Sequence, residues 1–410
     1  MPLDPPVSVA DIHAARAVLA GVIESTPMEH SQGLSDVVGA PVHLKCENLQ
    51  RAGSFKIRGA YTRMAGLEPD ERTRGVVAAS AGNHAQGVAL AGRLLGIEAT
   101  VYMPTGAAMP KLLATRGYGA RVHQVGSTID ECIEAARAHE ERTGAVFVPP
   151  FDHPDIVAGQ GTCGLEILEQ VPDVRTVLVC TGGGGLLAGI ATAVWARRPD
   201  VRVIGVQAQQ AAAWPASLAA RHPVPLTRMA TMADGIAVGR PGDVPFAVLQ
   251  QADRQVEIAT VAEDEIARAL LFCLERARLV VEPGGAAAVA HLLSGRVGTL
   301  RGPVVAVLSG GNVDPLLLRI IRTGLSVSGR YLQLSVRVPD LPGSLAQLLT
   351  HLAGQHVNVL DVQHARTEVS LHVHEVQIAI TVETEGHEHS DRVRQGLREQ
   401  GYLLASLPGT

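Results

Sequence analysis

The chain has 410 residues, enough for two or three domains and a large buried core. Its 35 Lys and Arg against 40 Asp and Glu leave a net charge of −5, which excludes the strongly basic surface that binds nucleic acid or acidic membranes. A hydrophobic content of 46% with only 3% aromatic residues excludes a disordered chain and suits an α/β enzyme.

Lysine is scarce: only three of the 35 basic residues are lysines, at Lys45, Lys56 and Lys111. Arginine can replace lysine as a surface charge, but its guanidinium keeps its proton and cannot act as an amine nucleophile. Codon bias and chance explain the scarcity as well as function does, so the count by itself leaves both interpretations open.

The cysteines and the first residues indicate where the protein works. The five cysteines are far apart and contain no CxxC pair: Cys46, Cys132, Cys163, Cys180 and Cys273. This pattern favours reduced thiols over a disulfide framework or a zinc site. Ser8 and Asp11 indicate a helix start, not a signal peptide, and no uncharged run is long enough for a membrane helix. We therefore expect a soluble, cytoplasmic protein.

From about residue 40 to 325, short apolar runs alternate with helical patterns. The clearest runs lie at 42–46, 75–80, 99–104, 176–182, 201–207 and 303–311. This alternation predicts a mostly parallel sheet with helices on both faces, in which ligands bind beyond the carboxyl ends of the strands.

The pattern changes near Ser328–Arg330 to an alternating β-α-β-β-α-β order, which predicts a ferredoxin-like module of about 75 residues. We expect an α/β domain at 1–327 and an α+β domain at 330–408.

Lys56 follows the first of these strands. A lysine near a strand end is most often a solvated surface charge. Here Phe55 and Ile57 flank it with apolar side chains, which tend to remove water from the amine and to lower its pKa. Because Schiff-base chemistry uses such amines, Lys56 is a candidate nucleophile.

Two turns of small residues also follow predicted strands. Ala79–Gly87 opens a predicted helix at 84–95, and Thr181–Gly189 contains four consecutive glycines. Backbone N–H groups at such helix starts suit a carboxylate or a phosphate. For the first turn, an ordinary connection with Asn83 as N-cap is an equal alternative. Four glycines carry a conformational cost that disfavours a purely structural role.

The glycine run also fits a loose dinucleotide fingerprint, through Gly183, Gly185 and Ala188. That site needs an acidic residue about 20 positions further on to bind the ribose, and Gln207 stands there instead. No lysine of the P-loop type follows the glycines. Both observations disfavour a nicotinamide or nucleotide cofactor.

Two further turns lie at expected strand ends or helix starts. Ser309–Asn312 follows the last apolar run of the α/β part, and for Glu282–Ala286 a helix cap is at least as good an explanation. The pairs His372/His374 and His387/His389 lack the cysteines or carboxylates that would complete a metal site, so we expect no metal.

The order and spacing of these motifs resemble those of the threonine dehydratases (threonine ammonia-lyases), which are pyridoxal-phosphate enzymes of fold type II. The likeness covers essentially residues 1–325 and runs through the whole of Lys45–Ala60. It implies that residues 1–327 form a two-lobed catalytic domain, with the smaller lobe at about 45–150. The C-terminal module, with Asp340–Leu345 and Asn358–Val362, resembles a single ACT domain, a small amino-acid-sensing unit.

The resemblance implies a role for each motif. Lys56 would hold pyridoxal 5′-phosphate through its amine and later remove the Cα proton of the substrate. Phe55 would lie against the ring, Asn83 would bind the 3′ oxygen, and Ser309 would meet the pyridine nitrogen. The phosphate would lie on the backbone amides of Gly182, Gly183, Gly184, Gly185 and Leu186. The substrate carboxylate would meet Ser80, Ala81, Gly82, Asn83 and His84, and an effector would meet Leu341, Gly343, Ser344 and Asn358.

The implied reaction is β-elimination of L-threonine to 2-oxobutanoate and ammonia, with L-serine giving pyruvate, under amino-acid regulation through the ACT domain. A neutral Ser309 hydroxyl does not hold the ring nitrogen protonated, which favours prompt loss of the β-hydroxyl over racemisation. Because ACT ligands usually bind between paired modules, we expect a homodimer or homotetramer, with no nucleic-acid or membrane partner.

Two departures from relatives limit the alternatives. Ala81 stands where related serine racemases carry a serine that acts as the second base, so a two-base racemase is disfavoured. Gln207 stands where several relatives have a metal-binding Glu, so a divalent metal site is disfavoured as well. A serine or hydroxyaspartate dehydratase remains an alternative on the same fold. A catalytically dead amino-acid-binding regulator is the alternative from another class, although the intact Lys56 and Ser309 argue against it. The effector, and whether the enzyme serves isoleucine synthesis or threonine breakdown, stay open.

Overall fold

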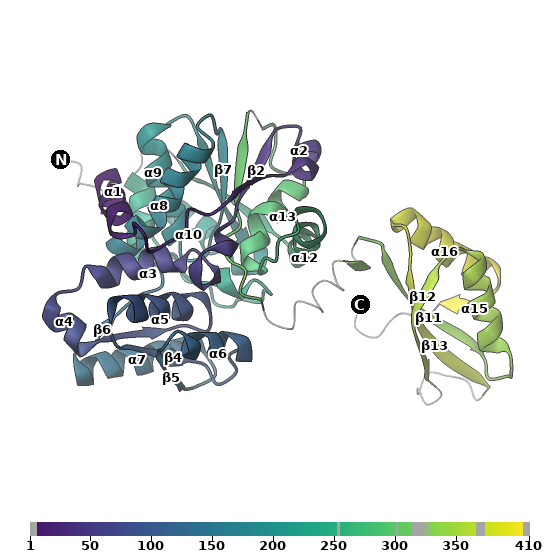
Figure 1. Ribbon diagram of the computed structural model, residues 1–410. Helices are drawn as coiled ribbons and strands as arrows, with labels where there is room; N and C mark the ends of the chain where they lie inside the picture. The colour runs from purple at the N-terminus through teal and green to yellow at the C-terminus, as the bar shows by residue number, and fades with distance from the viewer. Residues whose placement is uncertain are drawn as a thin grey trace. The chain divides into compact units, whose positions relative to one another are not determined.

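The computed structural model describes residues 6–251, 255–300, 302–313, 325–326, 328–365 and 374–404. The chain divides into two compact units, Met1–Leu317 and Leu318–Thr410, coloured purple to green and green to yellow in Figure 1. The domain bounds expected from the sequence, 1–327 and 330–408, remain a prediction. Residue 327 and residues 405–408 lie outside the described residues.

The larger sheet of the first unit has the strand order β1-β2-β10-β7-β8-β9, parallel throughout except for the β1–β2 pair. Its strands are β1 (Met28–His30), β2 (Val42–Lys45), β7 (Thr176–Cys180), β8 (Arg202–Ala208), β9 (Glu257–Val261) and β10 (Val304–Val307). Every residue of β7 and β10 is buried, as expected for parallel strands covered on both faces. Four of the apolar runs therefore form this sheet as predicted.

Helices cover both faces of the larger sheet, with α8 and α9 on one side and α2, α12 and α13 on the other (Figure 1). The helices of this lobe are α1 (Val9–Val18), α2 (Gln32–Val38), α8 (Pro154–Gln170), α9 (Gly185–Arg197), α10 (Trp214–Ala220), α11 (Asp243–Gln251), α12 (Glu263–Phe272) and α13 (Ala287–Leu293). The first begins where the sequence indicated, because Ser8 and Asp11 form a reciprocal capping box.

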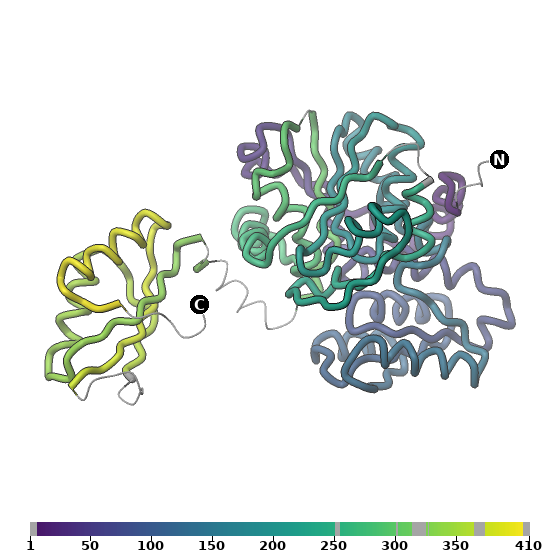
Figure 2. Tube along the Cα trace, turned by 180° about the vertical axis from the view of Figure 1, so that it is seen from behind, coloured from purple at the N-terminus to yellow at the C-terminus, as the bar shows by residue number. Residues whose placement is uncertain are grey.

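The smaller lobe contains an all-parallel sheet in the order β5-β4-β3-β6. Its elements are α3 (Lys56–Ala65), α4 (Pro69–Arg74), β3 (Val76–Ala79), α5 (Asn83–Leu95), β4 (Ala99–Met103), α6 (Met109–Gly117), β5 (Arg121–Gln124), α7 (Ile129–Thr143) and β6 (Val146–Phe147). Figures 1 and 2, drawn from opposite sides, both show these blue segments gathered apart from the teal and green larger lobe. Helix α3 contacts both α5 and α8, so it joins the two lobes.

The second unit is a four-stranded antiparallel sheet, β12-β13-β11-β14, with a core of its own. Its elements are β11 (Tyr331–Pro339), α15 (Ser344–Gly354), β12 (Asn358–Ala365), β13 (Glu375–Glu383), α16 (His387–Glu399) and β14 (Leu403–Leu404). Both helices lie on one face of the sheet (Figure 1). The predicted β-α-β-β-α-β order is confirmed.

The paired histidines of this unit differ in what the structure describes. His372 lies outside the described residues. His389 is buried on α16 and contacts the Gln355 carbonyl oxygen at 2.9 Å and the Glu385 N–H at 3.2 Å. It therefore ties the end of α15 to α16. Among the described residues, no helix combines the length and apolar character needed to cross a bilayer.

Candidate active site

One pocket between the two lobes collects the motifs that the sequence singled out. It is lined by Phe55, Lys56, Asn83, Gly182, Gly183, Gly184, Gly185, Leu186 and Ser309, among others. The residues come from segments that follow β2, β3, β7 and β10. Because those strands are parallel within each sheet, their carboxyl ends bring residues far apart in the sequence to one edge.

Lys56 is the first residue of α3, and its amine points into this pocket. The Nζ atom donates a hydrogen bond to the carbonyl oxygen of Pro150 at 2.9 Å and lies 5.0 Å from the centre of the Phe55 ring. Desolvation lowers the pKa of Lys56 to about 8, although the nearby Glu282 carboxylate opposes that shift. About one amine in ten is therefore unprotonated at pH 7, far more than for a solvated lysine.

The glycine run forms the turn between β7 and α9, and the packing around it requires glycine. Gly184 has φ = 100° and precedes the first residue of α9. A Cβ atom on Gly183 would lie 2.5 Å from the Phe151 ring, and one on Gly184 would lie 2.2 Å from the Trp214 indole. The Trp214 Nε1 donates to the Gly182 carbonyl oxygen at 2.9 Å. The backbone N–H groups of the first turn of α9 lack intrahelical acceptors and suit an anion.

Asn83 connects three separate segments of the chain. Its Nδ2 donates to Glu282 Oε1 at 2.6 Å, and its Oδ1 accepts from Asn312 Nδ2 at 2.8 Å. Gly82, not Asn83, is the N-cap residue of α5, so the alternative interpretation of Asn83 as a helix cap is wrong. Because an amide nitrogen carries two hydrogens, the bond to Glu282 leaves one for a ligand.

Glu282 is a site residue that the sequence interpretation did not assign. It is 3% exposed, and its Oε2 has no hydrogen-bond partner among the described residues. Burial raises the pKa of Glu282 to about 7, partly opposed by Lys111 and Lys56 and reinforced by Asp234. One signal was present: Glu282 is the single charged residue in the otherwise apolar stretch 279–290, where a carboxylate is hard to keep solvated.

In the turn at 80–84, the side chains of Ser80 and His84 are bonded within the protein. Ser80 Oγ accepts a hydrogen bond from the Gly82 N–H at 3.1 Å, and Ala81 is exposed. His84 is buried, and its Nε2 lies 2.8 Å from the Val148 carbonyl oxygen. Burial, together with the charge of Lys56, lowers the pKa of His84 to about 3. The imidazole is therefore neutral and bonded to Val148 inside the smaller lobe, so only the backbone of residue 84 is left to bind a ligand.

Gln207 stands where a dinucleotide-binding site or a metal site would need an acidic residue, and in this structure it has a structural role. It is fully buried, its Oε1 accepts from the Trp214 N–H at 3.0 Å, and its Nε2 donates to the Ala211 carbonyl oxygen at 3.3 Å. It therefore holds the start of α10 close to the end of β8. In the described parts of the chain, no three His, Cys, Asp or Glu side chains gather as metal ligands would.

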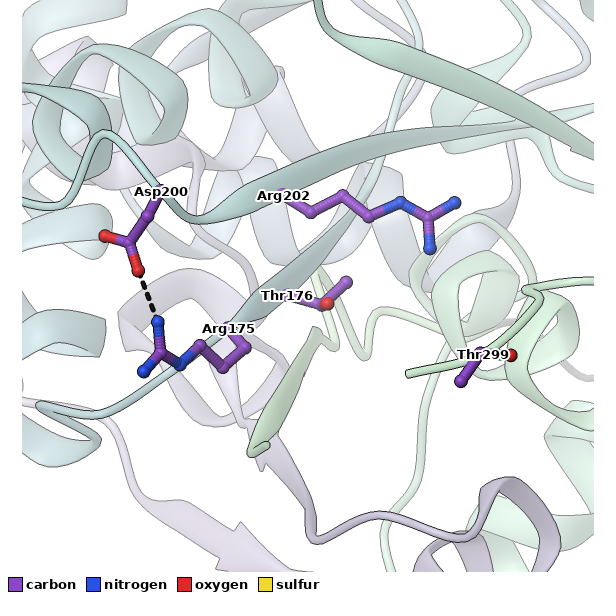
Figure 3. A pocket seen from close by; sticks show the side chains of 5 residues that line it. All are labelled: Arg175, Thr176, Asp200, Arg202 and Thr299. Atoms are coloured by element: carbon purple, nitrogen blue, oxygen red, sulfur yellow. Dashed lines mark hydrogen bonds and ion pairs between the residues drawn. The ribbon is translucent and has the colours of Figure 1, made fainter. Parts of the chain in front are cut away.

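A second hollow lies at the opposite, amino-terminal end of the larger sheet (Figure 3). It is lined by Arg175, Thr176, Asp200, Arg202 and Thr299. Its arginines are already paired: Arg175 with Asp200 at 2.6 Å, and Arg202 with Glu257 at 2.5 Å. Since ligands of parallel sheets bind at the carboxyl ends, the pocket around Lys56 is the stronger candidate site.

The ferredoxin-like unit has a pocket of its own. Leu341, Gly343 and Ser344, three of the four residues expected to meet an effector, line it with Asp340 and His364. Asn358, the fourth, does not line this pocket; it begins β12 and pairs with Glu383 of β13.

Comparison with known proteins gives both units a family. Residues 19–310 match the family "Pyridoxal-phosphate dependent enzyme", and residues 332–400 match the ACT domain. An L-threonine ammonia-lyase from Geobacter sulfurreducens is 45% identical over 386 residues, covering 94% of this chain and 96% of the relative. A protein of the same name from Thermotoga maritima is 44% identical over 397 residues, covering 97% and 98%. The solved structure of processed threonine deaminase isoform 2 from Solanum lycopersicum matches with a TM-score of 0.73 and 38% identity, covering 77% of this chain and 86% of that one.

Proposed function

The chain belongs to the pyridoxal-phosphate-dependent enzymes and carries an ACT domain, and we propose that it is an L-threonine ammonia-lyase. It converts L-threonine to 2-oxobutanoate and ammonia, and L-serine to pyruvate. The observation that carries this proposal is the desolvated amine of Lys56, placed in one pocket with the glycine turn and the Ser309 hydroxyl.

Pyridoxal phosphate fits the residues of this pocket. Its phosphate would rest on the backbone amides of Gly182–Leu186, where Phe151 leaves no room for a side chain at Gly183 and Trp214 leaves none at Gly184. Its 3′ oxygen would take the remaining hydrogen of Asn83 Nδ2, its ring nitrogen would face Ser309, and its aldehyde carbon would bond to Lys56. When bound, the cofactor supplies the electron-withdrawing ring that makes the Cα proton of an amino acid removable.

The protein's own groups then handle the protons. Lys56, with a pKa of about 8, accepts the Cα proton at neutral pH without needing a strongly basic medium. Burial raises the pKa of Glu282 to about 7, so this carboxyl group can hold or release a proton near neutral pH, while its Oε1 accepts from Asn83. Phe55 covers the amine and helps to exclude water.

The residues favour elimination over racemisation. Racemisation needs a second base that delivers a proton to the opposite face of Cα, and the methyl group of Ala81 cannot carry one. The neutral Ser309 hydroxyl favours loss of the β-hydroxyl over a long-lived carbanion. Serine or hydroxyaspartate elimination is the second candidate, because the same residues would serve it.

A substrate panel tests the proposal. The holoenzyme is assayed with L-threonine, L-serine, L-hydroxyaspartate and the D-isomers, and 2-oxo acid and ammonia are measured together. We expect L-threonine to have the highest kcat/KM, with one ammonia per 2-oxobutanoate. A higher kcat/KM for serine or hydroxyaspartate would show that this amino acid, and not threonine, is the preferred substrate. A protein that forms no 2-oxo acid and shows no cofactor absorption band would be the amino-acid-binding regulator.

We further propose that an amino-acid effector binds in the ACT pocket and that the chain assembles as a homodimer or homotetramer. Leu341 lines this pocket and is 67% exposed, which supports a second module covering it. The panel is repeated with isoleucine and valine, and sedimentation velocity gives the mass of the assembly. Kinetics that neither amino acid changes, or a monomer at assay concentrations, would contradict this part.

The cysteines support a reducing compartment, the cytoplasm. All five are free and buried, and burial raises the pKa of Cys46 and Cys273 to about 12, which keeps them as inert thiols. Alkylation under denaturing conditions should count five free thiols per chain in protein taken directly from cells. A lower count would contradict the assignment.

A further inference from the structure

Lys111 lies against the turn expected to receive the substrate carboxylate. It belongs to α6 and is 7% exposed. A Cβ atom on Gly82 would lie 3.4 Å from Lys111 Cδ and 3.5 Å from its Nζ. The ammonium group is therefore packed directly on residue 82, in the middle of the turn.

The partner of Lys111 comes from the other lobe. Lys111 Nζ donates to Asp234 Oδ2 at 2.5 Å, and Asp234 belongs to a short 3-10 turn, Asp234–Ile236. The two partners differ in exposure, since the side chain of Lys111 is 9% exposed and that of Asp234 is 58% exposed. Asp234 can therefore release the ammonium and return to water at little cost, whereas Lys111 has to keep an anionic partner.

The 3-10 turn Asp234–Ile236 also lines the pocket, so the ion pair of Lys111 and Asp234 lies beside it. A Cβ atom on Gly235 would lie 3.2 Å from Glu282 Oε1 and 3.9 Å from Asn83 Nδ2. Glu282 carries the buried Oε2 that has no partner among the described residues. Lys111 also acts electrostatically on Glu282 more strongly than Lys56 does. One polar cluster therefore lies at the 80–84 turn, formed by the side chains of Lys111, Asp234, Glu282 and Asn83.

Lys111 is the one cation among these four side chains, so an incoming anion would pair with Lys111 in place of Asp234. Lys56 is the one basic side chain, among the described residues, that lines the pocket itself. Its amine is committed to covalent chemistry in the proposed function, so it cannot also remain the cation opposite a carboxylate. Lys111 is the cation packed on the turn, and its present partner is the exposed Asp234.

We propose that Lys111 recognises the carboxylate of the amino-acid substrate, and that Asp234 holds its ammonium in place until the substrate arrives. This assignment deepens the proposed function and rests on it for the location of the carboxylate at residues 80–84. Its ligand class is broader than threonine: any 2-amino acid with a free carboxylate would use Lys111, and the corresponding amide would not.

Equilibrium binding separates recognition from structural support. L-2-aminobutyrate lacks the β-hydroxyl that is eliminated, so its dissociation constant, and that of its amide, can be read from the cofactor absorption of the holoenzyme. A charge-assisted hydrogen bond predicts that the wild-type protein binds the acid at least about 10-fold more tightly than the amide. In Lys111→Met this ratio should fall at least about 3-fold, because only the backbone N–H groups of the turn then remain to prefer the acid, while Lys111→Arg should keep part of the preference.

Asp234→Asn is the matched control, because it breaks the same ion pair but keeps the ammonium. We expect its acid-to-amide ratio to stay at the wild-type value or to rise. If Lys111 only joined the lobes, Lys111→Met would weaken both ligands equally and leave the ratio unchanged, and that result would overturn the proposal. An equal fall of the ratio in Asp234→Asn would overturn it as well.

Two further measures keep the test decisive. Should Lys111→Met fail to fold, Lys111→Gln takes its place, since the amide keeps polarity without charge. The binding measurement needs no turnover, so its outcome is independent of the substrate panel that tests the proposed function. A protein that binds 2-aminobutyrate in a Lys111-dependent manner but does not deaminate threonine would refute the proposed reaction and leave the role of Lys111 supported.

Discussion

The ion cluster behind Lys56 predicts that Glu47→Gln is severely destabilising. Arg58, two residues after Lys56 on α3, is fully buried and donates to both oxygens of Glu47, from Nε to Oε2 at 2.7 Å and from Nη2 to Oε1 at 2.8 Å. Its Nη1 donates to Glu166 at 2.7 Å, and Lys45 donates to the other oxygen of Glu166 at 2.6 Å. The cluster therefore fixes the helix that begins at Lys56.

The expected magnitude follows from burial. Removing one partner of a buried pair costs about 3–5 kcal/mol, because the other charge is left uncompensated. Arg58 keeps Glu166, so we expect a loss near 3 kcal/mol. Glu257→Gln is the matched control: Arg202 grips Glu257 with the same atoms, Nε and Nη2, but the side chains are 35% and 49% exposed. An exposed pair contributes about 1 kcal/mol or less.

Urea unfolding followed by tryptophan fluorescence measures both variants. Trp195 and Trp214 are the only tryptophans of the chain, and both lie in the catalytic unit, so the signal reports that unit alone. Equal losses in the two variants, or a loss below about 1 kcal/mol in Glu47→Gln, would refute the reasoning.

The pH dependence of this difference has a definite sign. Burial alone would raise the pKa of Glu47, but the Arg58 guanidinium, the Lys45 ammonium and the Thr26 hydroxyl together outweigh burial and hold that pKa below its ordinary value. A carboxylate with a depressed folded pKa contributes stability that is present above its unfolded pKa and is lost as the pH falls through the folded value. The gap between wild type and Glu47→Gln should therefore shrink on acidification, and a gap that widens would contradict this account.

Three other changes have equally direct outcomes. In Gly183→Ala the new Cβ meets the Phe151 ring at 2.5 Å, so cofactor affinity should fall at least about 10-fold; Gly106→Ala, with no atom within 4 Å, should leave the affinity unchanged in the same absorbance titration. Capture of pyridoxal phosphate by the cofactor-free protein should speed up as the pH rises and level off above about 8, because only the unprotonated Lys56 amine reacts; a stopped-flow rate that still rises about 10-fold per pH unit at pH 9 would argue against the lowered pKa. Removal of residues 330–410 should preserve deamination and abolish any response to isoleucine or valine, and inhibition curves identical to those of the full chain would show that the ACT domain is not the sensor.

Hydrophobic periodicity predicted the architecture well because burial on both faces leaves an unmistakable pattern. The apolar runs that form β7 and β10 are continuous, as strands covered by helices must be, and the alternation after residue 330 marks a sheet with one covered face. The turns at Asn83, Gly182–Gly185 and Ser309 were recognisable because each directly follows such a run, whereas Lys56 lies further on, at the start of the first helix after β2.

The rest of the site depends on distances between segments that no local pattern contains. Glu282 and Asn312 reach Asn83 from positions 199 and 229 residues away, and Asp234 reaches Lys111 across the two lobes. His84 stood in a convincing motif, yet its imidazole bonds to Val148 inside the smaller lobe. Only the folded structure decides which face of the turn such a side chain joins.

The scarcity of lysine also gains meaning from the structure. Lys45 is buried against Glu166, Lys111 is buried against Asp234, and Lys56 extends into the pocket. All three lysines therefore occupy sites where an amine has specific partners, and none serves as an ordinary surface charge.

The most direct test of the central assignment is turnover of L-threonine by Lys56→Ala, measured as 2-oxobutanoate formed by protein supplied with pyridoxal phosphate. The variant has no amine to hold the cofactor or to remove the Cα proton, so its activity should fall to the uncatalysed background while its urea unfolding stays close to that of the wild type. Turnover at an appreciable fraction of the wild-type rate would contradict the role of Lys56 and, with it, the proposed mechanism.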